Sequence, residues 1–124
     1  MGKRILIADD EPNIVASLEF LMEREGFEVV TAADGDAAIK AMKSGRPDLV
    51  LLDVMMPGKN GYEVCRHIRS DPGWQQVKIV MLSAKSRDTD IAKARALGVD
   101  AYLTKPFSSK ELVHQVNQLL GVHQ

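Results

Sequence analysis

Five short apolar runs recur along the chain, and their spacing constrains the fold more than any other feature of the sequence. Their centres lie roughly 20 to 30 residues apart, which is the length of a strand followed by a helix and its turns. The runs are Ile5–Ala8, Val29–Ala32, Leu49–Leu52, Ile79–Leu82 and Ala101–Thr104. The first, third and fourth are continuous and do not alternate with polar residues, as expected of strands covered on both faces. We therefore expect parallel strands near 4–8, 28–32, 49–52, 78–82 and 101–104.

Helical patterns occupy the segments between these runs. We expect helices near 11–25, 35–44, 61–70, 87–97 and 109–120. Two capping boxes mark helix starts, Asn60 with Glu63 and Ser108 with Glu111. Three helices end at glycines, in a place that favours a left-handed residue: Gly26, Gly45 and Gly98. The chain thus alternates strand and helix five times.

This alternation predicts an α/β fold, a (βα)5 doubly wound, flavodoxin-like parallel sheet. Right-handed crossovers with helices on both faces require the winding direction to reverse once. The common five-strand solution has the order 2-1-3-4-5. The longest loop, Ser70–Val77, is too short for a linker, and within it Trp74 is expected to anchor the chain. Residues 1–124 are expected to form a single domain, with no output domain visible.

Charge and cysteine content exclude several classes of protein. The 16 basic and 17 acidic side chains give a formal net charge of -1, which argues against direct binding of nucleic acid. The single cysteine, Cys65, cannot form an internal disulfide and favours a reducing compartment. No apolar run approaches the ~20 residues that span a membrane, and the start does not read as a signal peptide. We expect a cytoplasmic protein that does not enter the membrane.

Polar residues follow the strands that can reach one crevice. Asp9 and Asp10 follow the first strand, Asp53 the third, Ser83 the fourth and Lys105 the fifth. In an open α/β sheet, ligands bind beyond the carboxyl ends of the strands, where the winding reverses. Three carboxylates, a hydroxyl and an ammonium group are therefore expected to meet there.

Such a group of side chains suits phosphoryl chemistry that depends on a metal. Crowded carboxylates repel one another and need a cation, and Mg²⁺ prefers carboxylate, water and phosphate oxygens. Lys105 adds a positive charge suited to phosphate, and Ser83 adds a neutral donor. The pattern predicts a phosphoryl group carried on a carboxylate, with Asp53 as the nucleophile.

Four motifs in this order resemble the response-regulator receiver domain, the CheY-like family of two-component signalling, from Arg4 to Leu120. They are Asp9-Asp10, the run from Leu51 to Gly61 around Asp53, Ser83-Ala84, and Lys105-Pro106-Phe107. Each motif alone is weak. Together, at matching strand ends, they are specific.

The resemblance implies a phosphoacceptor and a metal site. Asp53 would accept the phosphoryl group. Asp10, Asp53 and the backbone carbonyl of Met55 would bind Mg²⁺ directly, and Asp9 would act through water. Mn²⁺ can substitute for Mg²⁺ in such a site.

The resemblance also implies a switch. Lys105 would pair with Asp53 and then with the phosphoryl oxygens, and its peptide bond to Pro106 would be cis. Ser83 would move to bond the phosphoryl group, and Tyr102 would turn inward behind it. The surface of the fourth helix, fifth strand and fifth helix would then change.

The function that follows is a phosphorylation-dependent signalling switch, not an enzyme in the ordinary sense. The donor would be a sensor histidine kinase or a histidine phosphotransfer protein, and the target a downstream protein or a fused output domain. Met55 and Lys85 stand where this family controls the access of water to phosphorus, and neither can orient water, so self-dephosphorylation is expected to be slow. The protein would be a monomer or a dimer promoted by phosphorylation.

Two other functions are compatible with this fold class. A phosphatase of the haloacid-dehalogenase type needs a second Asp two residues after the nucleophile, where this chain has Met55. A flavin or nucleotide binder would need a glycine-rich phosphate loop, and neither common form occurs. Among single residues, Asp10 could instead cap the first helix, and Asp53 could cap a turn before Pro57.

Overall fold

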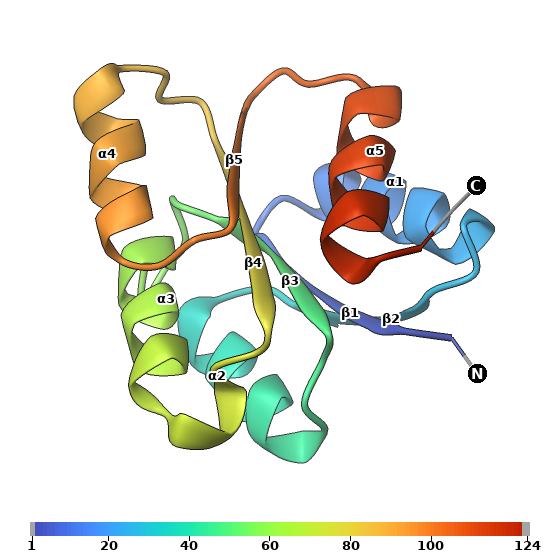
Figure 1. Ribbon diagram of the computed structural model, residues 1–124, viewed down its shortest axis with the longest axis horizontal. Coiled ribbons are helices and arrows are strands. Elements are labelled where there is room, and N and C mark those ends of the chain that lie inside the picture. The colour runs from blue at the N-terminus through green and yellow to red at the C-terminus, as the bar shows by residue number, and fades with distance from the viewer. Residues whose placement is uncertain (1, 123–124) are drawn as a thin grey trace.

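The computed structural model describes residues 2–122, in which five strands alternate with five α-helices (Figure 1). The strands are β1 (Arg4–Ala8), β2 (Glu28–Ala32), β3 (Leu49–Asp53), β4 (Lys78–Ser83) and β5 (Ala101–Thr104). The helices are α1 (Pro12–Arg24), α2 (Gly35–Ser44), α3 (Gly61–Ser70), α4 (Asp88–Ala96) and α5 (Ser109–Leu120), with a 3₁₀-helix, η1, at Pro72–Trp74. None of the helices in this range is long and apolar enough to cross a membrane.

The strands form one parallel sheet in the order β2-β1-β3-β4-β5. In its register Ile5 of β1 lies between Val29 of β2 and Leu49 of β3. Helices α1 and α5 cover one face, and α2, α3 and α4 cover the other (Figure 1). The predicted fold class and strand order are confirmed.

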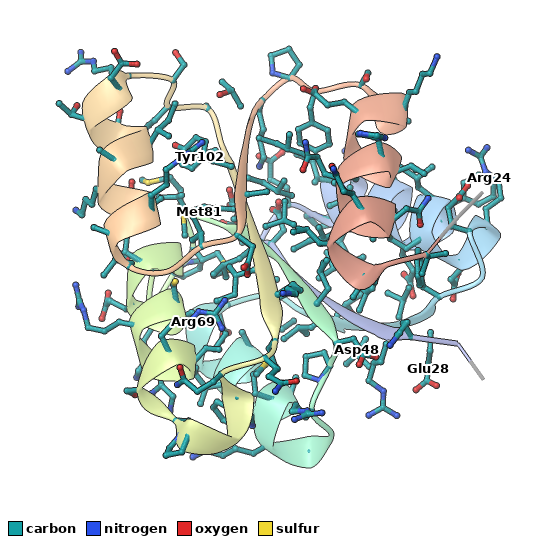
Figure 2. The ribbon with its side chains drawn as sticks, in the orientation of Figure 1. Arg24, Glu28, Asp48, Arg69, Met81 and Tyr102 are labelled. Carbon is teal, nitrogen blue, oxygen red and sulfur yellow. The ribbon has the colours of Figure 1, made fainter. Side chains whose placement is uncertain are left out.

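Two apolar clusters, one on each face of the sheet, form the core. Successive residues of a strand point to opposite faces, so Leu6 and Val50 pack under α2 and α3 while Ile5 and Leu49 pack under α1 and α5. Met81 of β4 belongs to the first cluster (Figure 2). Burial on both faces explains why the central strands read as continuous apolar runs.

Most predicted element bounds hold to within one residue. Helices α1 and α4 are one residue shorter at each end than predicted, and β3 and β4 each include one more residue, Asp53 and Ser83. The box at α3 is complete, with Glu63 N donating to Asn60 Oδ1 at 3.0 Å and Asn60 N to Glu63 Oε1 at 3.3 Å. At α5, Glu111 N donates to Ser108 Oγ at 3.0 Å.

The prediction for Gly45 is wrong. Gly26 and Gly98 have positive φ values of 92° and 98°, as a left-handed helix end requires. Gly45 has a φ of -179°, which is extended backbone that any residue adopts. A Cβ at Gly45 would meet the guanidinium of Arg4, the end of a flexible and partly exposed side chain that can move aside, so neither the backbone nor this contact requires glycine here.

The segment between α3 and β4 is more regular than predicted. Residues Pro72–Trp74 form η1, and Asp71 caps it by accepting a hydrogen bond from Gly73 N at 2.8 Å. Trp74 is buried in the cluster beneath α2 and α3, as an anchoring role requires.

Candidate functional site

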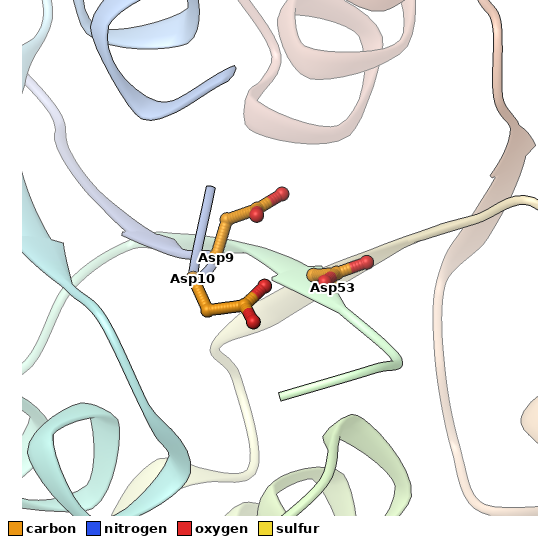
Figure 3. Close-up of side chains that lie close together, drawn as sticks. All are labelled: Asp9, Asp10 and Asp53. Carbon is orange, nitrogen blue, oxygen red and sulfur yellow. The ribbon is translucent and has the colours of Figure 1, made fainter. Parts of the chain in front are cut away.

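Three carboxylates meet at the carboxyl edge of the sheet, where the winding reverses. Asp9 and Asp10 follow β1, and Asp53 ends β3 (Figure 3). One carboxylate oxygen from each lies within 4.8 Å of the others. Asp9 and Asp53 are buried, whereas Asp10 is exposed. The sequence-predicted acids therefore lie together, with one side of the group open to solvent.

Lys105 lies within reach of two of these acids. Its Nζ is 3.1 Å from Asp53 Oδ1 and 3.3 Å from Asp9 Oδ2. Its backbone N–H donates to the carbonyl of Ser83 at 2.7 Å, which continues the pairing of β5 with β4. The cis peptide bond between Lys105 and Pro106 is confirmed.

Burial and charge shift the pKa values of Asp53 and Lys105. Burial raises the pKa of Asp53, and neighbouring Asp9 raises it further, against the opposing effect of Lys105. Burial lowers the pKa of Lys105, but Asp53 and Asp9 outweigh it, so the net pKa is raised. The ammonium thus stays charged, while the carboxylate is held in an environment that disfavours its ionised form.

Asp9, and not Asp10, contacts the start of the first helix. Asp9 Oδ1 accepts a hydrogen bond from Glu11 N at 2.9 Å, and its other oxygen faces Lys105. The residue at the N-cap is Glu11, and its own side chain makes no cap hydrogen bond within the described chain. The alternative in which Asp10 serves as a cap is not observed, which leaves the Asp10 carboxylate exposed beside Asp53.

The donor set fits a hard divalent cation. All three side chains offer carboxylate oxygens, the ligands that Mg²⁺ prefers, and exposed Asp10 leaves room for the waters that Mg²⁺ retains. Both oxygens of Asp9 already have protein partners, which favours Asp10 and Asp53 as direct ligands. The backbone carbonyl of Met55 as a ligand stays a prediction.

Ser83 and Tyr102 both contact the loop that follows β4. The buried Ser83 Oγ accepts a hydrogen bond from Lys85 N at 3.0 Å. The hydroxyl of Tyr102, on β5, donates to the carbonyl of Lys85 at 2.8 Å. A change at Ser83 can therefore pass to Tyr102 through one peptide segment, although their roles as switch residues stay predictions.

Gly61 lies next to the site, and the sequence did not reveal why this position needs a glycine. Its N–H donates to the carbonyl of Val54 at 2.8 Å, which holds the start of α3 against the end of β3. A Cβ at Gly61 would overlap the carbonyl oxygen of Asp53 and lie 2.8 Å from Val54 Cα. This glycine allows the close approach of α3 that sets the backbone position of Asp53.

Gly61→Ala is expected to destabilise the protein by about 2 kcal/mol, the usual cost of overpacking against backbone. Replacing glycine with alanine normally stabilises a helix, so a loss of stability reports the clash with Asp53 and not a change in helix propensity. Urea unfolding measures the difference. In the control, Gly73→Ala, the new Cβ meets nothing closer than 3.3 Å, and equal stabilities for the two variants would contradict the prediction.

Metal-free protein should be more stable after Asp53→Asn at pH 7. A carboxyl with a raised folded-state pKa stabilises the fold below its unfolded-state pKa, about 3.9, and loses that stability as pH rises through the folded value. Asn does not ionise and so does not lose this stability. The variant should therefore have a larger free energy of unfolding than the parent at pH 7, and the difference should vanish below about pH 4. Urea unfolding in chelator at both pH values tests this, and an advantage that did not depend on pH would contradict it.

Comparison with known proteins places this geometry in one family. Residues 5–117 match the family model described as the response regulator receiver domain. The DNA-binding response regulator MtrA of Mycolicibacterium smegmatis is 45% identical over 120 residues, which cover 97% of this chain and 51% of that protein. The chain therefore spans about half the length of this relative.

Solved structures agree with the family match. A Chloroflexus aurantiacus protein assigned as a response regulator superposes with a TM-score of 0.92 at 32% identity, over 98% of this chain and 99% of that one. The receiver domain of a sensor histidine kinase from Pseudomonas aeruginosa, solved with a magnesium ion coordinated in its active site cleft, gives 0.89 at 30% identity, over 98% and 99%. This chain belongs to the response-regulator receiver domain family of two-component systems.

Proposed function

We propose that the chain is a phosphorylation-dependent signalling switch that accepts a phosphoryl group on Asp53 from a histidine kinase or a histidine phosphotransfer protein. One observation carries the proposal. Asp53 is buried at the carboxyl edge of the sheet. The ammonium of Lys105 lies 3.1 Å from its carboxylate, and two further acids have oxygens within 4.8 Å. That surrounding suits a carboxylate that exchanges a phosphoryl group.

The transfer needs only positioning and charge neutralisation. An oxygen of Asp53 forms the new P–O bond while the P–N bond to the donor imidazole breaks. The bonding pair returns to that ring nitrogen, and the ring, already protonated on its other nitrogen, leaves as neutral imidazole. Lys105 faces the negative charge on the phosphoryl oxygens. Mg²⁺, held by Asp10, Asp53 and the carbonyl of Met55 with Asp9 acting through water, would supply the remaining neutralisation.

The phosphorylated form would differ in its surface. Ser83 would give up its bond from Lys85 N and donate to a phosphoryl oxygen, which disturbs the segment that also holds the hydroxyl of Tyr102. The surface of α4, β5 and α5 lies next to this segment in the chain. A downstream protein or a fused output domain would read that change.

Labelling with a small acyl phosphate tests the proposal. Incubation with Mg²⁺ should give one acid-labile phosphoryl group per chain, detected by intact-protein mass and by its loss in acid. Chelation of the metal should suppress labelling, and a second addition of Mg²⁺ should restore it. Absence of labelling, or labelling that survives acid, would contradict the proposal.

The phosphoryl group should be lost slowly in the absence of a phosphatase. Met55 is 64% exposed and Lys85 is exposed, and neither side chain can orient a water molecule toward phosphorus as an acid or amide can. Met55→Asn is expected to speed the release of phosphate by about tenfold, which is less than the roughly 10²–10⁴-fold of a full general acid or base, because an amide orients water without taking its proton. A time course of phosphate release measures this, with Met56→Leu as a control in the buried core. Equal rates for Met55→Asn and the parent would contradict the expectation.

A further inference from the structure

The hydroxyl of Tyr62 is buried without a hydrogen-bond partner. Tyr62 lies in the first turn of α3 and is 7% exposed. Among residues 2–122 its hydroxyl is the one buried side-chain polar atom for which the structure gives no partner. Burial of a polar group that forms no hydrogen bond destabilises a fold, so its presence calls for a physical reason.

The neighbours of Tyr62 come from α4 and β5. The ammonium of Lys93, on α4, lies over the Tyr62 ring at 4.3 Å from its centroid, a cation–π contact. Tyr62 also belongs to the apolar cluster against which Tyr102 of β5 packs. Burial raises the pKa of Tyr62, and Tyr102 and Asp90 raise it further. Tyr62 is thus the α3 residue that faces α4 and the switch residue on β5.

The face of α4 that carries Lys93 also carries a carboxylate that can serve as a hydrogen-bond acceptor. Asp90, Lys93 and Ala94 are spaced three and four residues apart, so they share one face of the helix. Ala94 is fully buried and Lys93 covers Tyr62, so this face points toward α3. Asp90 is half-buried and lies one turn before Lys93 on that face.

Helix α4 is held more weakly than its neighbours. All nine of its residues are described and only Ala94 is buried, whereas α3 has five buried residues among ten. Its N-cap, Arg87, makes no side-chain cap bond within the described chain. An element with so little buried surface can shift at low cost in free energy.

We propose that the Tyr62 hydroxyl is a latch for a second position of α4, in which it donates to the carboxylate of Asp90. The inference rests on the proposed function, because phosphorylation of Asp53 is what would favour that position. In the present position the hydroxyl has no partner, and in the second it gains a charge-assisted hydrogen bond. Since the bond exists in one state only, it biases the equilibrium and does not merely stabilise the fold.

The test compares variants in the presence and absence of a phosphoryl mimic. Beryllofluoride with Mg²⁺ occupies the acceptor site without covalent turnover, so its affinity reports the free-energy difference between the states. Tyr62→Phe is expected to weaken beryllofluoride binding about tenfold, which corresponds to one charge-assisted hydrogen bond. The same variant should unfold in urea no more easily than the parent when no mimic is bound.

A double-mutant cycle identifies the acceptor. Asp90→Asn is expected to weaken binding to a similar extent, and the double variant no further, because both changes remove the same bond. Asp88→Asn, an exposed acid in the first turn of α4, is the matched control and should bind as the parent does. Additive losses would overturn Asp90 as the partner, and unchanged affinity in Tyr62→Phe would overturn the latch.

The outcomes also separate this inference from the proposed function. If the parent chain is labelled on Asp53 and binds beryllofluoride while Tyr62→Phe binds equally well, only the latch is wrong. If the parent chain neither binds the mimic nor accepts a phosphoryl group, the proposed function fails and the latch fails with it.

Discussion

Asp53→Asn is expected to abolish phosphoryl labelling. The amide has nearly the shape of the carboxylate, so the fold and the contacts around it should persist. It lacks the charged oxygen that forms the bond to phosphorus, and none of its neighbours can replace it. Asp9 has both oxygens engaged by Glu11 N and Lys105, and the exposed Asp10 is proposed to bind the metal. Acid-labile phosphate should fall by at least about a hundredfold, the scale expected when a nucleophile is removed.

Two further substitutions make this result specific. Asp10→Asn leaves the acceptor in place but weakens the metal site, so it should slow labelling and raise the Mg²⁺ concentration required. Asp88→Asn removes an exposed acid of α4 and should be labelled at the parent rate. Undiminished labelling of Asp53→Asn would place the acceptor elsewhere.

The site could be predicted from sequence because each of its parts is local. A continuous apolar run defines a strand, and the residue after it defines a strand end, so Asp9, Asp10, Asp53, Ser83 and Lys105 could be assigned to one edge without coordinates. The alternation of strands and helices indicates a doubly wound parallel sheet, and the predicted strand order is the common solution for five strands. The sequence could not show which of the two acids after β1 contacts Glu11 N, because that depends on the direction of the backbone after the strand.

Other features depend on partners distant in sequence and could not be predicted. Gly45 looked like a helix-terminating glycine in the left-handed region, yet its conformation is extended, and it lies beside the Arg4 side chain of β1. Gly61 belonged to a recognised motif, but the structure explains why glycine is needed there: a Cβ would overlap the carbonyl oxygen of Asp53, eight residues earlier. A sequence does not show which backbone carbonyls accept hydrogen bonds from a side chain. Among the described residues, the side chain with the most such acceptors is that of Arg69.

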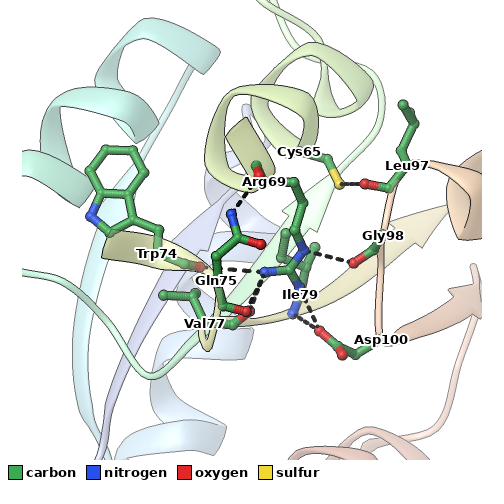
Figure 4. Close-up of polar contacts among 9 residues, drawn as sticks. All are labelled: Cys65, Arg69, Trp74, Gln75, Val77, Ile79, Leu97, Gly98 and Asp100. Atoms are coloured by element: carbon green, nitrogen blue, oxygen red, sulfur yellow. Dashed lines mark hydrogen bonds and ion pairs between the residues drawn. The ribbon is translucent and has the colours of Figure 1, made fainter. Parts of the chain in front are cut away.

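Arg69 joins three segments of the chain through its guanidinium (Figure 4). Its Nε donates to the carbonyl of Gly98 at 2.9 Å, and its Nη1 donates to the carbonyl of Val77 at 2.8 Å. Its Nη2 lies 2.9 Å from Asp100 Oδ2, which also accepts a hydrogen bond from Ile79 N at 2.8 Å. The two charged side chains are 18% and 28% exposed. One side chain of α3 thus ties together the segments that enter β4 and β5.

Arg69→Met is expected to lower the free energy of unfolding by about 2 to 3 kcal/mol. Methionine preserves the unbranched aliphatic stem, so the loss reports the polar contacts. The carbonyls of Gly98 and Val77 lose their charged donor, and Asp100 loses its counter-charge in a partly covered place. Urea unfolding followed by circular dichroism measures the change.

Arg66→Met is the matched control, because Arg66 is an exposed arginine one turn earlier on the same helix. It should change stability by less than about 0.5 kcal/mol. Arg69→Lys tests geometry apart from charge, since an ammonium cannot reach Gly98, Val77 and Asp100 together, and it should recover only part of the loss. Full recovery by lysine would show that the charge opposite Asp100 matters and the bonds to the carbonyls do not. An Arg69→Met variant as stable as the control would mean that water satisfies these carbonyls as well as the guanidinium does.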